Sequence, residues 1–206
     1  MFDEVRDHWY LRPGWREDRS FYTWHLTFAG DCAVARLFSA YEPVIATMPG
    51  IAPVPLEWLH LTLQGVGFAD RVEPGELRAI TEAAESRLER FSPFDVTIGP
   101  AVVDPETVQL PVTPAEPLQR LRNTIRAAIA DVWGPDAVPE LPALNPHITL
   151  GYFTTPAPAA PLLAHLAAAP AHTATTTLAS VSLITLTRSP HLYHWTPVIT
   201  LQLPTR

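Results

Sequence analysis

The sequence predicts an α+β fold made of two similar lobes, and two features support that prediction. One is a strand pattern that occurs twice, at residues 60–63 (His-Leu-Thr-Leu) and 147–150 (His-Ile-Thr-Leu). The other is the order of segments, since a strand and a helix are expected before each of these strands and a helix after each. Together they favour an internal duplication of a two-layer lobe.

The chain begins with an N-terminal arm, residues 1–20, that lacks clear periodicity but contains several aromatic and arginine residues. We expect it to pack on the domain surface; the alternative is that its aromatic residues cover a cleft or stack on a base. A strand follows from Phe21 to Phe28. Asp31 then caps a helix whose apolar residues recur at helical spacing, namely Val34, Leu37, Tyr41 and Ile45. Pro43 is expected to kink or end this helix.

The first His-x-Thr strand comes next, and Pro74 then opens a second helix with an apolar stripe of Leu77, Ile80, Ala84 and Leu88. Residues 94–103 and 107–111 predict two strands joined by a turn at Asp104-Pro105. The sequence Thr-Pro-Ala-Glu at 113–116 has the form of a capping box with proline at the first helical position. It predicts a third helix that ends near Gly134.

The second His-x-Thr strand follows a proline-containing loop at 139–146. Residues 156–170 predict a short helix, and two long strands, 175–187 and 193–203, then close the chain. With 206 residues, of which 47% are apolar, the chain is long enough for one core but too short for two independent domains. We therefore expect a single bilobal domain over residues 21–206.

The charge pattern limits the function. A formal net charge of −7 argues against a protein that coats long nucleic acid, which needs an extended basic surface, but leaves a small anionic ligand open. All 14 basic residues are arginine. The absence of lysine excludes lysine Schiff-base chemistry, a P-loop lysine and a ligase that adenylates its own lysine.

The single cysteine, Cys32, forms no internal disulfide and no cysteine-based zinc site, which fits a reducing compartment. The N-terminus lacks the apolar segment of a secretory signal, and no apolar run approaches the ~20 residues that span a bilayer. A cytoplasmic protein without a membrane segment is expected.

Each His-x-Thr strand places its polar residues on one face, because side chains alternate along a strand. His60 and Thr62 share a face, as do His147 and Thr149, and the intervening apolar residues belong to a core. Two more His-x-Thr sequences occur, beginning at His25 and His194. The tripeptide alone is a weak signal. Apolar neighbours and a following glycine distinguish the copies that begin at His60 and His147.

With both strands in this order, the chain resembles the two-histidine phosphoesterase superfamily, which includes bacterial 2'-5' RNA ligase-like proteins and RNA cyclic phosphodiesterases. The resemblance spans residues 21–203 and rests on the segments 60–63 and 146–151, and more weakly on the closing hairpin at 186–203. It implies two lobes related by a pseudo-twofold axis. Their antiparallel sheets face a central cleft with helices outside, and each lobe offers one His-x-Thr pair to a phosphate.

The resemblance also implies the hydrolysis of a 2',3'-cyclic phosphate, at the end of an RNA or in a small nucleotide, without a metal or other cofactor. One group must take a proton from water, and another must give a proton to the departing ribose oxygen. His60 and His147 are expected to share these roles, and Thr62 and Thr149 to donate to the non-bridging oxygens. The sequence leaves open which histidine is the base, and the roles exchange in the ligating direction.

Four more residues are candidates for substrate contact. His25 lines the same cleft if its strand lies beside that of His60. Gln64 shares a face with His60 in a regular strand, although a buried amide satisfied by the backbone is an equal alternative. Tyr152 either stacks on a base or packs in the core. Arg188, at a strand end, either reaches an anionic substrate or is a solvated turn residue.

Two other hypotheses stand beside the phosphoesterase. His25, His60 and His147 on neighbouring strands are adequate ligands for zinc in a metal hydrolase. Alternatively, the same fold binds a nucleotide or RNA end without turnover. The acidic balance favours a short or mononucleotide substrate over a long nucleic acid, and a monomer is expected.

Overall fold

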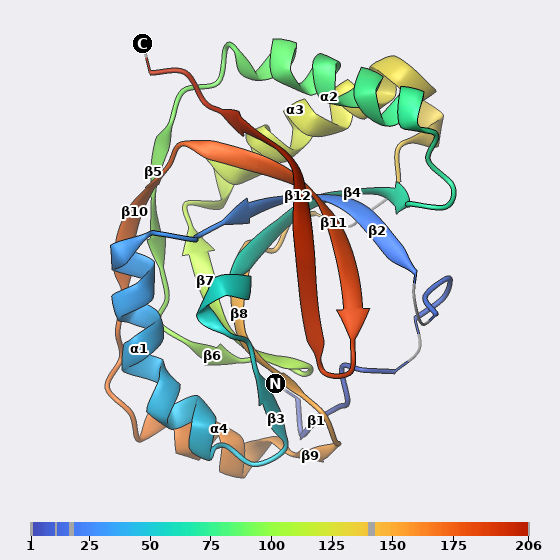
Figure 1. The fold of residues 1–206 in the computed structure, drawn as a ribbon. Helices are drawn as coiled ribbons and strands as arrows, with labels where there is room; N and C mark the ends of the chain where they lie inside the picture. Colours follow the sequence, from blue (N-terminus) through green and yellow to red (C-terminus); the bar gives the residue numbers. More distant parts are fainter. Residues whose placement is uncertain (1, 11, 17–18, 140–142, 206) are drawn as a thin grey trace.

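Two large antiparallel sheets, one two-stranded sheet and four helices make up the described part of the fold (Figure 1). The structure is a computed structural model, and it describes residues 2–10, 12–16, 19–139 and 143–205. None of the helices within these ranges is long and apolar enough to cross a membrane.

The first sheet, which we call lobe one, has the strand order β12-β11-β2-β4. Its strands are β2 (Ser20–Thr27), β4 (His60–Phe68), β11 (Ser180–Ser189) and β12 (Leu192–Gln202). Helix α3 (Ala115–Trp133) packs against β4, and α2 (Pro74–Leu88) packs on α3. Four apolar residues of α3 that recur at helical spacing are buried, namely Leu118, Leu121, Ile125 and Ile129.

The second sheet, lobe two, has the strand order β10-β5-β7-β8-β3, and β6 pairs with β7. Its strands are β3 (Ile51–Pro53), β5 (Phe94–Ile98), β6 (Val102–Val103), β7 (Thr107–Thr113), β8 (His147–Phe153) and β10 (Ala174–Leu178). Helix α1 (Cys32–Thr47) packs on this sheet, and α4 (Ala159–Ala167) packs beside β6. Two short 3-10 turns are η1 (Leu56–Trp58) and η2 (Pro135–Ala137).

The two halves of the chain exchange helices. Helix α1 follows β2 of lobe one but covers lobe two, and α3 follows β7 of lobe two but covers lobe one. Asp31 caps α1 as predicted, accepting from the backbone N–H groups of Ala33 and Val34. Each lobe is therefore covered by a helix that follows, in the sequence, a strand of the other lobe.

Both His-x-Thr strands contain a β-bulge directly after the threonine. In β4, Thr62 pairs with His25 and Gln64 with Trp24, which leaves Leu63 without a partner. The pairing in β8 is equivalent, with Thr149 opposite Gln109, Gly151 opposite Val108 and Leu150 unpaired. Such an extra residue re-aims the side chains that follow it, so strict alternation ends at the threonine.

Helix α1 continues through Pro43 to Thr47, so of the two effects expected of this proline, a kink or an end, the end does not occur. Another prediction about a helix end is wrong. The capping box expected at 113–116 is absent: Thr113 is the last residue of β7, Pro114 precedes the helix, and no side chain caps α3. The pairing of β7 with β5 holds Thr113 in the sheet, where it lies opposite Thr97.

Two predicted strands are divided. The strand expected at 94–103 is broken into β5 and β6 at Gly99-Pro100, where Gly99 has φ +89° and a Cβ would lie 2.8 Å from the carbonyl oxygen of His172. The strand expected at 175–187 is β10 in lobe two and β11 in lobe one, which meet at Ala179. A continuous strand pattern thus passes from one sheet to the other.

The N-terminal arm contacts both lobes. Its strand β1 (Glu4–Val5) pairs with β9 (Ala157–Pro158), and the backbone N–H of His8 donates to the carbonyl of Phe153. Further along, Trp15 packs against the rings of Phe21 and Phe68 in lobe one. The arm therefore packs against residues of both lobes.

Candidate active site

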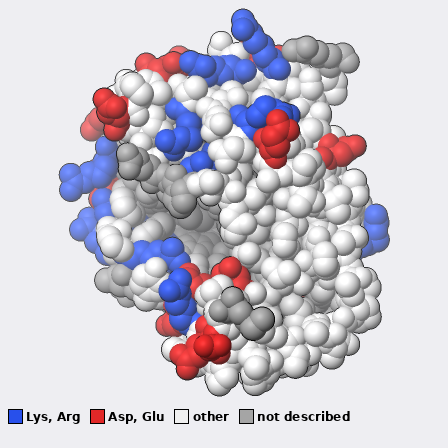
Figure 2. Space-filling model, turned by 180° about the vertical axis from the view of Figure 1, so that it is seen from behind, with Lys and Arg blue, Asp and Glu red and all other residues white. Residues whose placement is uncertain are grey.

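A cavity of about 570 Å³ lies between the two sheets. The histidine and threonine of both motifs line it, His60 and Thr62 from β4 and His147 and Thr149 from β8. Figure 2 shows the hollow on the face opposite to the view of Figure 1. The fold thus brings together the four residues that the sequence predicts to be catalytic.

The two motif histidines are held in the same way. His60 Nδ1 lies 2.8 Å from the carbonyl oxygen of Trp58, and His147 Nδ1 lies 2.8 Å from that of Asn145. A carbonyl oxygen only accepts, so each Nδ1 carries a proton and donates. In both rings Nε2 is then the nitrogen that is available for proton transfer.

Burial lowers the pKa of His60 to about 4. The hydrogen bond to the Trp58 carbonyl opposes this effect, and the nearby His147 adds to it, because two imidazolium ions repel each other. His60 is therefore neutral at physiological pH, with a lone pair on Nε2. Such a group accepts a proton and does not donate one.

Each motif threonine contacts a buried polar side chain. The hydroxyl of Thr62 lies 3.2 Å from His25 Nε2, and Tyr152 forms a side-chain hydrogen bond with Thr149. His25 is 1% exposed, and its ring stacks on that of His60 with centroids 4.4 Å apart and an angle of 4°. His25 thus belongs to the wall of the cavity, beside the first motif.

Tyr152 lines the cavity but is only 6% exposed. Its ring packs against the aromatic rings of His8, Trp9 and Tyr193. Of the two alternatives given for Tyr152, the structure shows packing in the core, and its hydroxyl also contacts Thr149.

The expectation that Gln64 faces the substrate is wrong, and the bulge at Leu63 is the reason. Gln64 is 0% exposed; its amide donates to the carbonyl of Gly65 and accepts from Arg126 on α3. The bulge turns Gln64 toward the helix layer and brings Gly65 to the cavity instead. The alternative of a buried, satisfied amide is the correct one.

Arg188 is not among the described residues that line the cavity. Its guanidinium donates to the carbonyl of Tyr10 and lies 5.2 Å from the ring centroid of Trp9. It therefore holds the N-terminal arm against the hairpin of lobe one. The expectation that it reaches the substrate is replaced by this role.

Sequence reasoning missed the acidic residue at the lobe-two side of the cavity. Glu106 accepts from Arg6 and Arg12 at 2.9 and 2.8 Å and contacts His8 at 3.0 Å. Among the described residues that line the cavity, Arg12 is the one arginine. No sequence pattern links an arm residue to a turn almost a hundred positions away.

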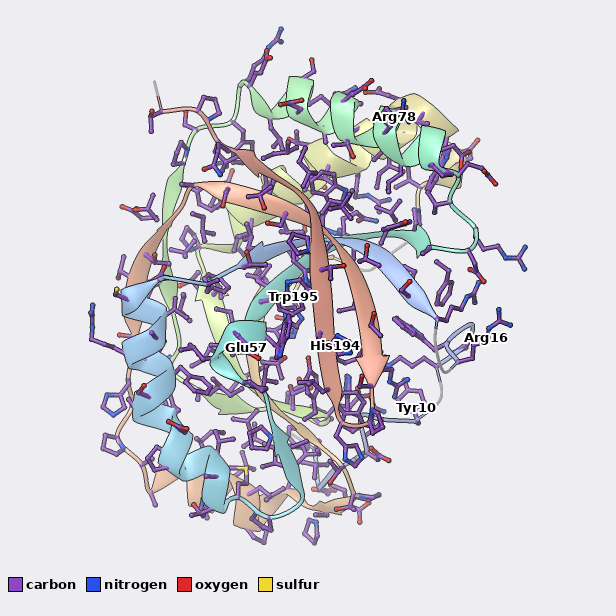
Figure 3. All side chains as sticks on the ribbon, in the orientation of Figure 1. Tyr10, Arg16, Glu57, Arg78, His194 and Trp195 are labelled. Carbon is purple, nitrogen blue, oxygen red and sulfur yellow. The ribbon has the colours of Figure 1, made fainter. Side chains whose placement is uncertain are left out.

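Trp195 was also missed. Its ring lies edge-on to His60, with centroids 5.0 Å apart, and also contacts His25. Figure 3 shows it near the centre of the molecule, beside η1. The fourth His-x-Thr copy surrounds it, but His194 itself contacts Ser189 and is outside the cavity wall formed by the described residues. Trp195 lies two residues after Tyr193 in the same strand, and Tyr193 lines the cavity. This period-two spacing is the signal that could have identified Trp195.

The geometry gives no support to a zinc site on His25, His60 and His147. Two of these rings are stacked face to face, so their nitrogens do not converge on one point. Within the described ranges, no three His, Cys, Asp or Glu side chains are grouped in a way that holds a metal ion.

Figure 2 also shows the charge around the hollow. On this face several basic side chains lie along one rim of the hollow, with uncharged and acidic residues among and beside them.

A family model for the 2'-5' RNA ligase superfamily matches residues 34–190. No functionally curated protein sequence matches the chain. The match includes both His-x-Thr strands and excludes the N-terminal arm, β2 and all of β12.

Solved structures with the same fold include several phosphoesterase-like proteins. A crystal structure described as a phosphoesterase is 19% identical, covers 91% of this chain and 100% of its own, and has a TM-score of 0.67. TT0787 of Thermus thermophilus is 25% identical over 90% of this chain and 97% of its own, with a TM-score of 0.64. E. coli LigT complexed with 3'-AMP is 17% identical over 91% and 99%, with a TM-score of 0.63. The predicted fold class is confirmed by these likenesses.

Proposed function

Because the chain belongs to the 2'-5' RNA ligase superfamily, a family of two-histidine phosphoesterases and ligase-type enzymes, we propose that it opens a 2',3'-cyclic phosphate by hydrolysis. The observation that carries the proposal is the cavity between the sheets, which is lined by one His-x-Thr pair from each lobe. A phosphate between the lobes has one imidazole on either side, as in-line displacement at phosphorus requires.

His60 is the general base in this proposal. As the neutral histidine, it takes a proton from water at Nε2 while the water oxygen attacks phosphorus. His147 is the general acid: its Nε2 gives a proton to the ribose oxygen as the bond between that oxygen and phosphorus breaks. The product is a ribose with one phosphate monoester and one free hydroxyl. Thr62 and Thr149 donate hydrogen bonds to the non-bridging oxygens, on which negative charge increases.

The substrate is a mononucleotide or a short RNA end. A cavity of about 570 Å³ is within the size range of small-molecule sites and suits a nucleotide. Arg12, tied to Glu106, is its one described arginine, and a long RNA requires many phosphate contacts. E. coli LigT, which shares the fold, has been crystallised with 3'-AMP, a ligand of this size. A monomer suffices, because both lobes belong to one chain.

The test is the hydrolysis of a 2',3'-cyclic mononucleotide in the presence of a chelator. The native protein is compared with His60→Ala and His147→Ala, and with His194→Ala as a control in which the histidine comes from a His-x-Thr copy outside the cavity wall. Each cavity variant is expected to lose roughly 10²- to 10⁴-fold in kcat, with His194→Ala close to native.

Several outcomes would contradict the proposal. Absence of turnover by the native protein, combined with tight nucleotide binding, would favour a binding protein. Loss of activity on chelation would favour a metal hydrolase. Native turnover in either cavity variant would show that the paired histidines do not perform the chemistry.

A further inference from the structure

His25 occupies a position beside the first motif to which the paired-histidine chemistry assigns no role. It lies opposite Thr62 in the pairing of β2 with β4, and its Nε2 is 3.2 Å from the Thr62 hydroxyl oxygen. Its ring is confined between His60, which stacks on it, and Trp195, whose ring is edge-on at 5.8 Å. At 1% exposure, it has little freedom to turn.

The surroundings of His25 determine which ring nitrogen carries the proton. Its Nδ1 is buried and has no hydrogen-bond partner among the described residues. An orphaned buried N–H is rarer and more costly than an acceptor left without a donor. The proton therefore resides on Nε2, and Nε2–H donates to Thr62. Burial lowers the pKa of His25 well below its ordinary value, so the ring remains neutral and Nδ1 stays unprotonated.

This tautomer fixes the direction of the Thr62 hydroxyl. If Nδ1 carried the proton, Nε2 would accept from Thr62, and the hydroxyl proton would point into the wall. With Nε2–H as the donor, the threonine oxygen accepts from His25 and its own proton is free to point into the cavity. A hydroxyl that accepts one hydrogen bond is also a better donor of the next.

Lobe two supports its threonine with a different residue. The position that corresponds to His25 is Gln109, opposite Thr149, but its side-chain oxygen accepts from Thr107. The partner of Thr149 is Tyr152, whose pKa burial holds well above its ordinary value, so the phenol stays protonated. Gly65 takes the place that corresponds to Tyr152 in lobe one, so each threonine has a different polar partner.

We propose that His25 is a positioning residue whose Nε2–H donates to Thr62 and so aims the threonine hydroxyl at a phosphoryl oxygen. The inference rests on the proposed function, because the hydroxyl serves catalysis only if a phosphate occupies the cavity. His25 itself touches neither the reacting atoms nor the transferred proton.

A double-mutant cycle tests the proposal. His25→Phe keeps a ring in the stack but removes the donor, and Thr62→Val removes the hydroxyl on which His25 acts. We expect His25→Phe to lower kcat roughly 10-fold with KM changed less than about 2-fold, as for the loss of one hydrogen bond to the transition state. In the Thr62→Val background the same change should lower kcat by less than about 2-fold.

His25→Gln provides the rescue. Glutamine is the residue at the corresponding position of lobe two and retains an N–H donor, so kcat should return to within about 3-fold of native. Melting curves of all variants serve as the folding control. Equal losses from His25→Phe with and without the Thr62 hydroxyl, or native activity of folded His25→Phe, would overturn the proposal.

Nitrogen NMR of the imidazole rings separates this inference from the proposed function, because it needs no turnover and no variant. The native protein should show His25 with a protonated Nε2 and an unprotonated Nδ1 near neutral pH. A protonated Nδ1 would refute the role of His25 even in an active enzyme. The expected tautomer in a protein that fails to hydrolyse cyclic phosphates would preserve the geometry and refute the function.

Discussion

The two lobes of this protein share one strand geometry but support it with different side chains. In both, a histidine donates from Nδ1 to the carbonyl two residues earlier, and a bulge follows the threonine. In lobe one the threonine partner is His25 on the neighbouring strand, whereas in lobe two it is Tyr152 on the same strand. The repeated part is therefore the His-x-Thr pair that lines the cavity, and the part that differs is the side chain that contacts the threonine.

Among changes that leave both motif histidines in place, the largest effect is expected from removing the repeated hydroxyls. Thr62→Val and Thr149→Val should each lower kcat by roughly 10²-fold, because each loses a donor to charge that builds on a non-bridging oxygen. Steady-state hydrolysis of a 2',3'-cyclic nucleotide measures this loss. Thr196→Val, from the exposed threonine of the fourth His-x-Thr copy, is the matched control. Activities equal to that of the control would show that the pairs are not equivalent phosphate holders.

The second prediction concerns His60, the motif histidine of lobe one. Burial lowers the folded-state pKa of His60 to about 4, from an ordinary value of 6.5. Between these values the unfolded chain binds a proton that the folded protein does not bind, so stability rises with pH across this window. On acidification from pH 6.5 to 4, this one site should reduce the free energy of unfolding by about 3 kcal/mol. His8 and His25, whose pKa values burial also lowers, act in the same direction.

Thermal melts at a series of pH values check this prediction. His60→Phe should flatten the dependence of the melting temperature on pH. Thr62→Val changes the same wall without removing a titratable group, so it should keep the native dependence. An unchanged slope in His60→Phe would show that folding does not lower the pKa of His60.

The smallest effects are expected where the arm crosses the two lobes. Arg12 lines the cavity, while Arg188 holds the arm at Tyr10. Arg12→Gln should raise KM roughly 5-fold with little change in kcat, through the loss of a charged contact with an anionic substrate. Arg188→Gln should change either constant by less than about 2-fold. A larger effect of Arg188→Gln in the same assay would restore the sequence interpretation of that residue as a substrate contact.

Patterns in the sequence predicted the elements and their order, and the resemblance to two-histidine phosphoesterases predicted that His60 and His147 line one cavity. The element predictions succeeded because they depend on local periodicity, which burial on one face of each strand imposes. The apolar stripe of α1, for example, is buried at all four predicted positions, Val34, Leu37, Tyr41 and Ile45.

What the sequence did not predict depends on pairing between distant strands. A bulge at Leu63 arises from the register of β4 against β2, so the alternation that assigned Gln64 to the cleft had no means of detecting it. The division of residues 174–189 between two sheets is likewise a property of neighbours and not of propensity. The exchange of α1 and α3 between lobes and the contact of Arg12 with Glu106 join segments that no local pattern connects.

The most direct test of the account is the pH dependence of kcat/KM for hydrolysis of a 2',3'-cyclic nucleotide by the native protein, His60→Ala and His147→Ala. The native profile should show an acid limb whose midpoint lies near 4 and reports protonation of His60. His60→Ala should lose this limb, whereas His147→Ala should keep it at a much lower maximum. An acid limb that persists in His60→Ala, or that is absent from the native profile, would contradict the claim that His60 of lobe one is the general base.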